Sequence, residues 1–198
     1  MGVAYIRIQD ASAPNEFLRE CCEFCIAAGA QRIYAAGHDC LQGYPLFTEI
    51  WEMECQVCDL PHTNALLRPI CKDTLEEWKR LYNERMRAIP NAATMTQREA
   101  EKHMESGDGY FVCRGDVLLG IGIVSAGKVD CVISLRPGEG ETVLLALCHG
   151  QSLPKVVLEV ASANQKAVAL YRRMGFRISQ RGEFWYCVFP GEMSKGVK

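Results

Sequence analysis

Two polar residues near the C-terminus have types and a spacing that could hold and activate a ligand. Asn164 and Tyr171 are seven residues apart, in a stretch where apolar residues recur every three or four positions before Gly175. At 3.6 residues per turn, both side chains point the same way, roughly 10 Å apart along the helix axis. An amide group therefore lies at the start of the helix and a phenol, which can donate a hydrogen bond or a proton, lies two turns further along. An amphipathic helix with a packed tyrosine and a capping asparagine is the alternative.

A glycine-bearing turn comes about 25 residues earlier and has the pattern of an anion site. It runs from an expected strand into an expected helix over Glu141–Cys148, and its sequence is Leu135-Arg136-Pro137-Gly138-Glu139-Gly140. Glycines let the backbone come close to a ligand, and a helix start offers N–H groups and the positive end of the dipole to an anion. Pyrophosphate is the anion expected here. The carboxylates of Glu139 and Glu141 would repel it, and we expect Arg136 or Lys166 to offset them.

The stretch from Leu158 to Phe176 reads L-x-V-x-x-x-N-x-x-A-x-x-L-Y-x-x-x-G-F. This pattern resembles the strand and helix that carry the pantetheine arm of acetyl-CoA in the GNAT superfamily of N-acetyltransferases. In that family the asparagine contacts the cofactor arm, and the tyrosine lies near the thioester sulfur. The earlier turn resembles the family's Q/R-x-x-G-x-G/A motif, although Leu135 replaces the first Gln or Arg. The resemblance implies that acetyl-CoA is bound by Val132, Ile133, Leu135, Arg136, Gly138, Glu139, Gly140, Glu141, Asn164, Ala167 and Tyr171.

Acetyl transfer to an amine needs a neutral nucleophile, donors for the oxyanion and a way to release thiolate. In the family, main-chain N–H groups of the strand that here spans Val132–Leu135 supply the donors. Tyr171 is the expected donor to the sulfur, by hydrogen bonding first and proton transfer second, because a phenol is a weaker acid than a thiol. Asp130 is the candidate base; a solvent-exposed aspartate with a water chain as the base is the alternative.

The acceptor is expected to be a primary amine of a small molecule or peptide. The family usually lines its acceptor site with the region between the first two helices of the domain, which makes Tyr82, Asn83, Asn91 and Thr94 candidate substrate contacts. The alternative function is a non-catalytic module that binds CoA and uses the N-terminal half as an interaction surface. The sequence leaves a homodimer open.

Composition narrows the class of protein. The chain has 198 residues, 48% of them hydrophobic and 23% charged, and a formal charge of −2. These values fit a globular protein and give no reason to expect nucleic-acid binding. Arg7 and Asp10 interrupt any signal peptide, and no apolar run is long enough to span a membrane, so the cytoplasm is expected.

Eleven cysteines without a secretory signal suggest reduced thiols. Cys22 with Cys25, and Cys55 with Cys58, have C-x-x-C spacing. A four-thiolate zinc site is the alternative, but the pairs are about thirty residues apart, more than is usual for a zinc ribbon, and we expect no metal. Cysteines on one face of a helix more often pack as small hydrophobic residues.

The expected fold class is α/β, a GNAT-like fold with a mixed sheet and an N-terminal degenerate half-GNAT unit. Residues 1–60 would form that half, without a cofactor motif, from a strand, a helix and two strands: Ala4–Ile8, Phe17–Ala28, Arg32–Ala36 and Leu46–Val57. Residues 61–198 would form the GNAT domain, with strands at Leu66–Ile70, Tyr110–Cys113, Val117–Val124, Lys128–Leu135 and Val156–Val160. Capping boxes are expected at Asp73 with Glu76 and at Thr96 with Glu99, and Ser162 is the expected N-cap of the last helix.

Overall fold

The computed structural model describes residues 2–9, 12–87 and 94–189. The chain forms two compact units. The first unit consists of residues 1–51, 161–165 and 181–198, and the second of residues 52–160 and 166–180. This division differs from a boundary at residue 60, because two long strands each contribute one part to each unit.

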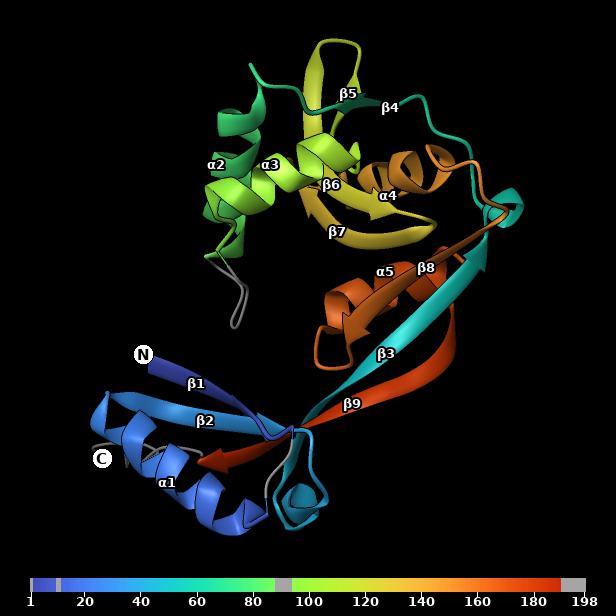
Figure 1. The fold of residues 1–198 in the computed structure, drawn as a ribbon. Helices are drawn as coiled ribbons and strands as arrows, with labels where there is room; N and C mark the ends of the chain where they lie inside the picture. The colour runs from blue at the N-terminus through green and yellow to red at the C-terminus, as the bar shows by residue number, and fades with distance from the viewer. Residues whose placement is uncertain (1, 10–11, 88–93, 190–198) are drawn as a thin grey trace, which may run out of the picture. The chain divides into compact units, whose positions relative to one another are not determined.

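The described residues form five α-helices, two 3-10 helices and nine strands (Figure 1). They are β1 (Gly2–Arg7), α1 (Pro14–Ala27), β2 (Ala30–Ala36), the 3-10 helix η1 (Asp39–Gly43), β3 (Leu46–Gln56), the 3-10 helix η2 (Val57–Asp59), β4 (Leu66–Pro69), α2 (Leu75–Met86), α3 (Gln97–Ser106), β5 (Gly109–Arg114), β6 (Val117–Ser125), β7 (Lys128–Ser134), α4 (Gly140–His149), β8 (Lys155–Ala161), α5 (Gln165–Arg173) and β9 (Arg177–Phe189). Hydrogen bonding joins the strands in the order β1-β2-β9-β3-β8-β7-β6-β5-β4. The pairs β1–β2 and β7–β8 are parallel, while β2–β9 and β4 to β7 pair antiparallel, so the expected mixed sheet is confirmed.

In the first unit, α1 covers the sheet face that carries Ile6, Ile8, Ile33 and Ala35. Leu18 is the buried residue of this helix. The partly buried thiols of Cys21, Cys22 and Cys25 pack against the same core, which confirms the expectation that they serve as small hydrophobic residues. The expected order of strand, helix, strand and strand in residues 1–60 is also confirmed.

In the second unit, helices cover both faces of the strands β5 to β7. Trp78 of α2 and Ala100 of α3 pack on one face, with alternate strand residues such as Ile121 and Ile133. On the other face, α4 lies so close to β6 that a Cβ atom at Gly122 would meet the Leu147 side chain. Glycine on β6 therefore allows α4 to sit directly against the strands that precede it.

The helix starts confirm one expected cap and correct two. Thr96 and Glu99 form the predicted capping box of α3. The box at Asp73 is wrong, because α2 begins at Leu75 and its N-cap is Thr74, whose hydroxyl is bonded to Cys71. The N-cap at Ser162 is wrong as well, because α5 begins three residues later.

Candidate functional site

The parallel strands β7 and β8 separate after a short paired stretch. Lys128 pairs with Val157 and Val129 with Leu158, and these are the pairs that the described residues form between the two strands. Both strands continue beyond this point, β7 to Ser134 and β8 to Ala161. The divergence opens a gap in the hydrogen-bonding ladder along the second half of β7.

The register of β7 decides which main-chain groups face that gap. The N–H of Leu135 donates to the carbonyl of Leu119, 2.9 Å away, and Ile133 lies opposite Ile121 in the same register. Since hydrogen-bonded and non-hydrogen-bonded pairs alternate in an antiparallel ladder, Ile133 bonds toward β6 and Val132 points toward the β8 side. Of the two residues predicted to offer main-chain donors, Val132 is therefore the one in position.

The turn between β7 and α4 matches the geometry expected of an anion site. Gly138 has φ +83°, a left-handed conformation that only glycine adopts easily. Glu139 is the N-cap of α4, but its side chain caps none of the main-chain N–H groups of the first turn in the described structure. The amides of Gly140, Glu141 and Thr142 are therefore left without a side-chain cap at the positive end of the helix dipole.

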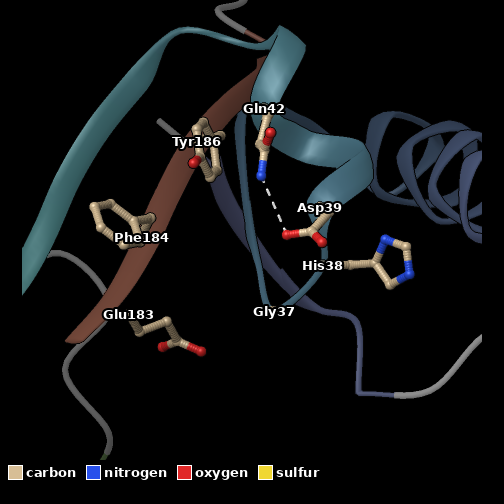
Figure 2. Close-up of a pocket in the computed structure, with 7 residues that line it drawn as sticks. All are labelled: Gly37, His38, Asp39, Gln42, Glu183, Phe184 and Tyr186. Carbon is tan, nitrogen blue, oxygen red and sulfur yellow. Dashed lines mark hydrogen bonds between the residues drawn. The ribbon is translucent and has the colours of Figure 1, made fainter.

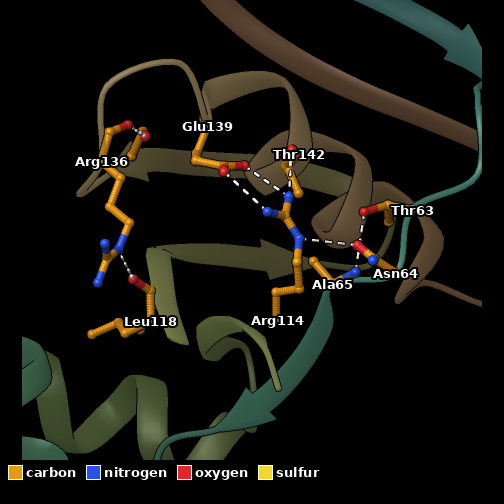
Figure 3. Close-up of polar contacts among 9 residues, drawn as sticks. Thr63, Asn64, Ala65, Arg114, Leu118, Arg136, Glu139 and Thr142 are labelled. Atoms are coloured by element: carbon orange, nitrogen blue, oxygen red, sulfur yellow. Dashed lines mark hydrogen bonds and ion pairs between the residues drawn. The ribbon is translucent and has the colours of Figure 1, made fainter. Parts of the chain in front are cut away.

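Charge at this turn is balanced by arginines (Figure 3). Arg114, at the end of β5, donates to both carboxylate oxygens of Glu139, at 3.1 and 2.9 Å, and also to Asn64. The hydrogen bonds from Arg114 hold the pKa of the Glu139 carboxyl below its usual value. Glu141 lies 3.2 Å from Arg173 of α5. Arg136, which was expected to offset these charges, donates to the carbonyl of Leu118, and its charge also helps to lower the pKa of the Glu139 carboxyl.

Tyr171 lies on α5 beside two buried thiols of the same unit. Burial, and then the neighbouring thiols of Cys131 on β7 and Cys148 on α4, raise the pKa of Tyr171 to about 12. Its ring contacts that of Phe176, with centroids 5.9 Å apart. Asn164 directly precedes this helix and is exposed, while Ala167 is half-buried on it. The phenol is therefore a neutral group at any ordinary pH.

No protein-family model matches the sequence, and no curated protein matches it. Solved structures do match. The GCN5-related N-acetyltransferase of Sphaerobacter thermophilus is 16% identical, with a TM-score of 0.56 over 91% of this chain and 70% of that one. The corresponding protein of Anabaena variabilis is 10% identical, with a TM-score of 0.57 over 86% and 49% of the two chains. A GNAT acetyltransferase of Colwellia psychrerythraea is 13% identical, with a TM-score of 0.53 over 80% and 65%.

This chain has a GNAT fold. At these identities the likeness concerns the fold alone, and the chain spans between about half and 70% of the length of those three structures. The predicted fold class is confirmed, while the site residues remain predictions about function.

Within the GNAT fold, Asp130 is the first residue of β7 beyond the stretch paired with β8. Its carboxylate accepts a hydrogen bond from Ser125 at 3.0 Å and lies 3.7 Å from the ammonium group of Lys128. The side chain is exposed, and strand alternation places it on the face opposite Cys131. Its role as the base stays a prediction. In the structure, its carboxylate forms a surface ion pair with Lys128.

The four predicted substrate contacts lie in different environments, and one of them is outside the described residues. Both amide atoms of Asn83 bond to the main chain of Met95, at 2.8 and 3.0 Å, so this residue ties α2 to the segment before α3. Tyr82 packs on the core of the second unit, and burial followed by Cys131 raises its pKa. Thr94 is exposed, and Asn91 lies outside the described residues. Their contact with an acceptor remains a prediction.

Two pockets are relevant to ligand binding. The second unit has one of about 650 Å³ beside the start of α4, lined by Gly138, Thr142, Arg114 and His62 among others. The first unit has one of about 590 Å³, lined by Gly37, His38, Asp39, Gln42, Glu183, Phe184 and Tyr186 (Figure 2). Gln42 donates to Asp39 and Arg7 pairs with Glu183, so both carboxylates of the first-unit pocket already have partners.

Two further findings concern a possible metal site on the cysteines and a membrane-spanning helix. All eleven cysteines are free thiols, and the part of the chain that the structure describes contains no group of three or more side chains able to hold a metal. Cys22 and Cys25 lie in the first unit and Cys55 and Cys58 in the second. None of the described helices is both long enough and apolar enough to cross a bilayer.

Two residues with strong structural signatures were missed by the sequence analysis. Arg114 ends a strand and carries no motif that would distinguish it from an ordinary surface arginine. Glu49 had a weak signal, because it is a carboxylate in the middle of the expected apolar strand Leu46–Val57. It is buried in the first unit, with 7% of its surface exposed.

Proposed function

We propose that the protein is an acetyl-CoA-dependent N-acetyltransferase that moves an acetyl group to a primary amine of a small molecule or peptide. The observation that carries the proposal is the separation of β7 from β8, which leaves the main chain of Val132 facing a gap. The same unit contains the uncapped start of α4 and the half-buried Tyr171, whose phenol has a raised pKa. The GNAT fold supports the same reaction class.

The residues at the turn fit a CoA molecule. Amides at the start of α4 would hold the diphosphate, and Gly138 keeps the turn in a conformation that leaves them accessible. Arg114 forms an ion pair with Glu139, and Arg173 forms one with Glu141. These pairs reduce the repulsion that the two carboxylates would exert on the anion. Asn164 and Ala167 would contact the pantetheine arm, as the family resemblance implies.

The chemistry follows from the groups around that arm. Acetyl-CoA supplies an activated acetyl thioester. The N–H of Val132 would donate to the thioester oxygen, where negative charge develops as the amine attacks the carbonyl carbon. Tyr171 would donate a hydrogen bond to the sulfur as the bond to the acetyl group breaks.

Hydrogen bonding, and not proton transfer, is the role that the phenol can perform. With its pKa at about 12, Tyr171 is weaker as an acid than a thiol of pKa about 8.5. Complete transfer of its proton to the thiolate would be uphill by about 5 kcal/mol, taking 1.36 kcal/mol for each pKa unit. The thiolate would therefore take its proton from solvent after release, and the amine would lose its proton to Asp130 or to water.

The test combines calorimetric binding of CoA with an assay of CoA release from acetyl-CoA over a panel of primary amines. We expect micromolar to millimolar binding and turnover on at least one amine. Binding without turnover on every acceptor would support the alternative, a CoA-binding module without catalysis. Absence of heat from CoA and acetyl-CoA at millimolar concentration would overturn both.

A further inference from the structure

The pocket of about 650 Å³ beside the start of α4 lies wholly within the second unit. Its walls come from the segment that leads into β4, from the end of β5, from the turn at Gly138 and from one side of α4. Gly138 belongs to the turn that is proposed to hold the diphosphate, so the pocket is continuous with that site. Its volume is within the range of about 300–1,000 Å³ that is usual for small-molecule sites.

Arg114 is held at the wall of this pocket by four hydrogen bonds (Figure 3). Its Nε donates to Oδ1 of Asn64 at 3.1 Å, and its two terminal nitrogens donate to the carboxylate of Glu139. Nη2 also donates to the hydroxyl of Thr142 at 3.4 Å. Because a guanidinium group has five N–H donors, the second N–H of Nη1 is left without a partner among the described residues.

The neighbouring side chains have used their acceptors and kept their donors. Since a guanidinium group only donates, the oxygen of the Asn64 amide must face Arg114, and its NH2 group is left for another partner. The hydroxyl oxygen of Thr63 accepts from the N–H of Ala65 at 3.2 Å, so its own proton is available. The pocket therefore presents N–H and O–H donors, which suit an anionic ligand.

The charged groups that act on this turn are positive in sum. Three guanidinium groups and two carboxylates give a net charge of +1, and they belong to Arg114, Arg136, Arg173, Glu139 and Glu141. Glu141 lines the pocket itself, but its carboxylate lies 3.2 Å from the guanidinium of Arg173. An anion in the pocket would therefore meet carboxylates that are already paired with cations.

The ring of His62 adds a flat surface to the same pocket. His62 is exposed, and its ring stacks on that of His149, with centroids 5.5 Å apart and an angle of 19° between the planes. A ring nitrogen of His149 is in turn bonded to the carbonyl of Pro61, 2.9 Å away. The stack covers one face of the His62 ring, and a nucleotide base can stack on the other.

We infer that this pocket takes the adenosine 3′-phosphate end of CoA. In CoA, the diphosphate joins the pantetheine arm to an adenosine that carries a phosphate on its 3′ oxygen. With the diphosphate at the Gly138 turn and the arm between β7 and β8, the adenosine enters the pocket that shares this turn. Its base stacks on His62, and its 3′-phosphate accepts from the donors of Thr63, Asn64 and Arg114. The inference rests on the proposed function, since it concerns the cofactor of that reaction.

The first experiment measures binding to the full chain by calorimetry. The probes are CoA and dephospho-CoA, together with adenosine 3′,5′-bisphosphate and adenosine 5′-monophosphate, which lack the pantetheine arm. We expect CoA to bind about ten- to a hundredfold more tightly than dephospho-CoA, as for a hydrogen bond to a charged group, and the bisphosphate to exceed the monophosphate by a similar factor. Equal binding of CoA and dephospho-CoA would overturn the inference with the unmodified protein alone.

A first variant tests the donors. Asn64→Asp keeps the oxygen that faces Arg114 and replaces the NH2 group with an acceptor, so it should remove the preference for CoA over dephospho-CoA. The matched change Gln97→Glu makes the same change of charge on α3, on the other face of the sheet from α4, and should keep the preference. Retention of the preference in Asn64→Asp would place the 3′-phosphate elsewhere and refute the inference.

A second variant tests the ring. His62→Ala should weaken CoA and dephospho-CoA by the same factor, about five- to a hundredfold, as for the loss of one stacked base, and His62→Phe should restore the affinity. Unchanged affinity in His62→Ala would contradict the placement of the base.

The outcomes separate the two proposals. CoA binding without a preference over dephospho-CoA defeats only the pocket inference. The preference without acetyl transfer to any amine defeats only the proposed function.

Discussion

Replacing Tyr171 by Phe tests the chemical role assigned to the phenol. The change keeps the ring that packs on Phe176, so the fold should survive. It removes one hydrogen bond to a sulfur that becomes anionic during the reaction. Such a bond is worth about 1.5–3 kcal/mol, and if it forms only as the thiolate develops, kcat should fall about ten- to a hundredfold. The KM for acetyl-CoA should change little.

The pH dependence separates a hydrogen-bond donor from a proton donor. Because the pKa of Tyr171 is about 12, the phenol stays protonated throughout the range from pH 7 to 9.5. The ratio of wild-type to Tyr171→Phe kcat should therefore be constant across that range. The assay is initial-rate CoA release at saturating acetyl-CoA, with Tyr110→Phe as a control for loss of a phenol elsewhere in the second unit.

Three results would refute this reasoning. A loss above about 10⁴-fold would exceed what general acid catalysis and one hydrogen bond normally contribute, and would indicate that the variant has lost the geometry of the site. A ratio near one would reduce Tyr171 to a packing residue. A ratio that shrinks steadily above pH 8 would mean that the phenol titrates in that range, contrary to its burial.

Three further predictions follow from the same structure. The pKa of Tyr171 is raised in the folded protein above its unfolded value of 10, so its contribution to stability is present below pH 10 and is lost as the pH rises toward 12. Between pH 8 and pH 11, the free energy of unfolding of the wild type, measured by urea denaturation, should therefore fall by about 1.4 kcal/mol more than that of Tyr171→Phe. Gly122→Ala should destabilise the protein by about 1–3 kcal/mol, since the new methyl would come within 2.5 Å of Leu147; no change in the urea midpoint would contradict the close packing of α4. Gly138→Ala, at φ +83°, should cost about 1–2 kcal/mol and weaken CoA binding by calorimetry, whereas Gly107→Ala, at φ +68°, should cost similar stability and leave CoA binding intact.

Local patterns predicted the elements that carry the candidate site. The strand before Ser162, the helix with Tyr171 and the glycine turn at Gly138 all came from short-range spacing, because each is determined by residues within one or two turns. The capping box at Thr96 succeeded for the same reason. Periodicity and turn chemistry are sufficient where the interacting groups are neighbours in the chain.

Predictions failed where a distant residue competes for the same group. Ser162 has the right side chain for a helix cap, but its hydroxyl accepts from the N–H of Glu49, 113 residues earlier. Long-range pairing is hidden in the same way: β3 and β9 each contribute to both compact units, and strand pairing between distant parts of a chain leaves no local signal. The burial of Glu49 could not be predicted for the same reason, since it depends on tertiary packing.

At the acidic turn before α4, ion pairs with arginines change the effect on anion binding that the sequence alone would suggest. Glu139 and Glu141 at the start of a helix suit the dipole but oppose a bound diphosphate. In the structure, Arg114 holds both oxygens of Glu139, and Arg173 lies beside Glu141. Each carboxylate is thus turned toward a cation, while the amides of the first turn keep their N–H groups free of any side-chain cap in the described structure. An anion arriving there would meet oriented donors and arginine partners together, so the acidic residues help to position Arg114 and Arg173 beside it without excluding it.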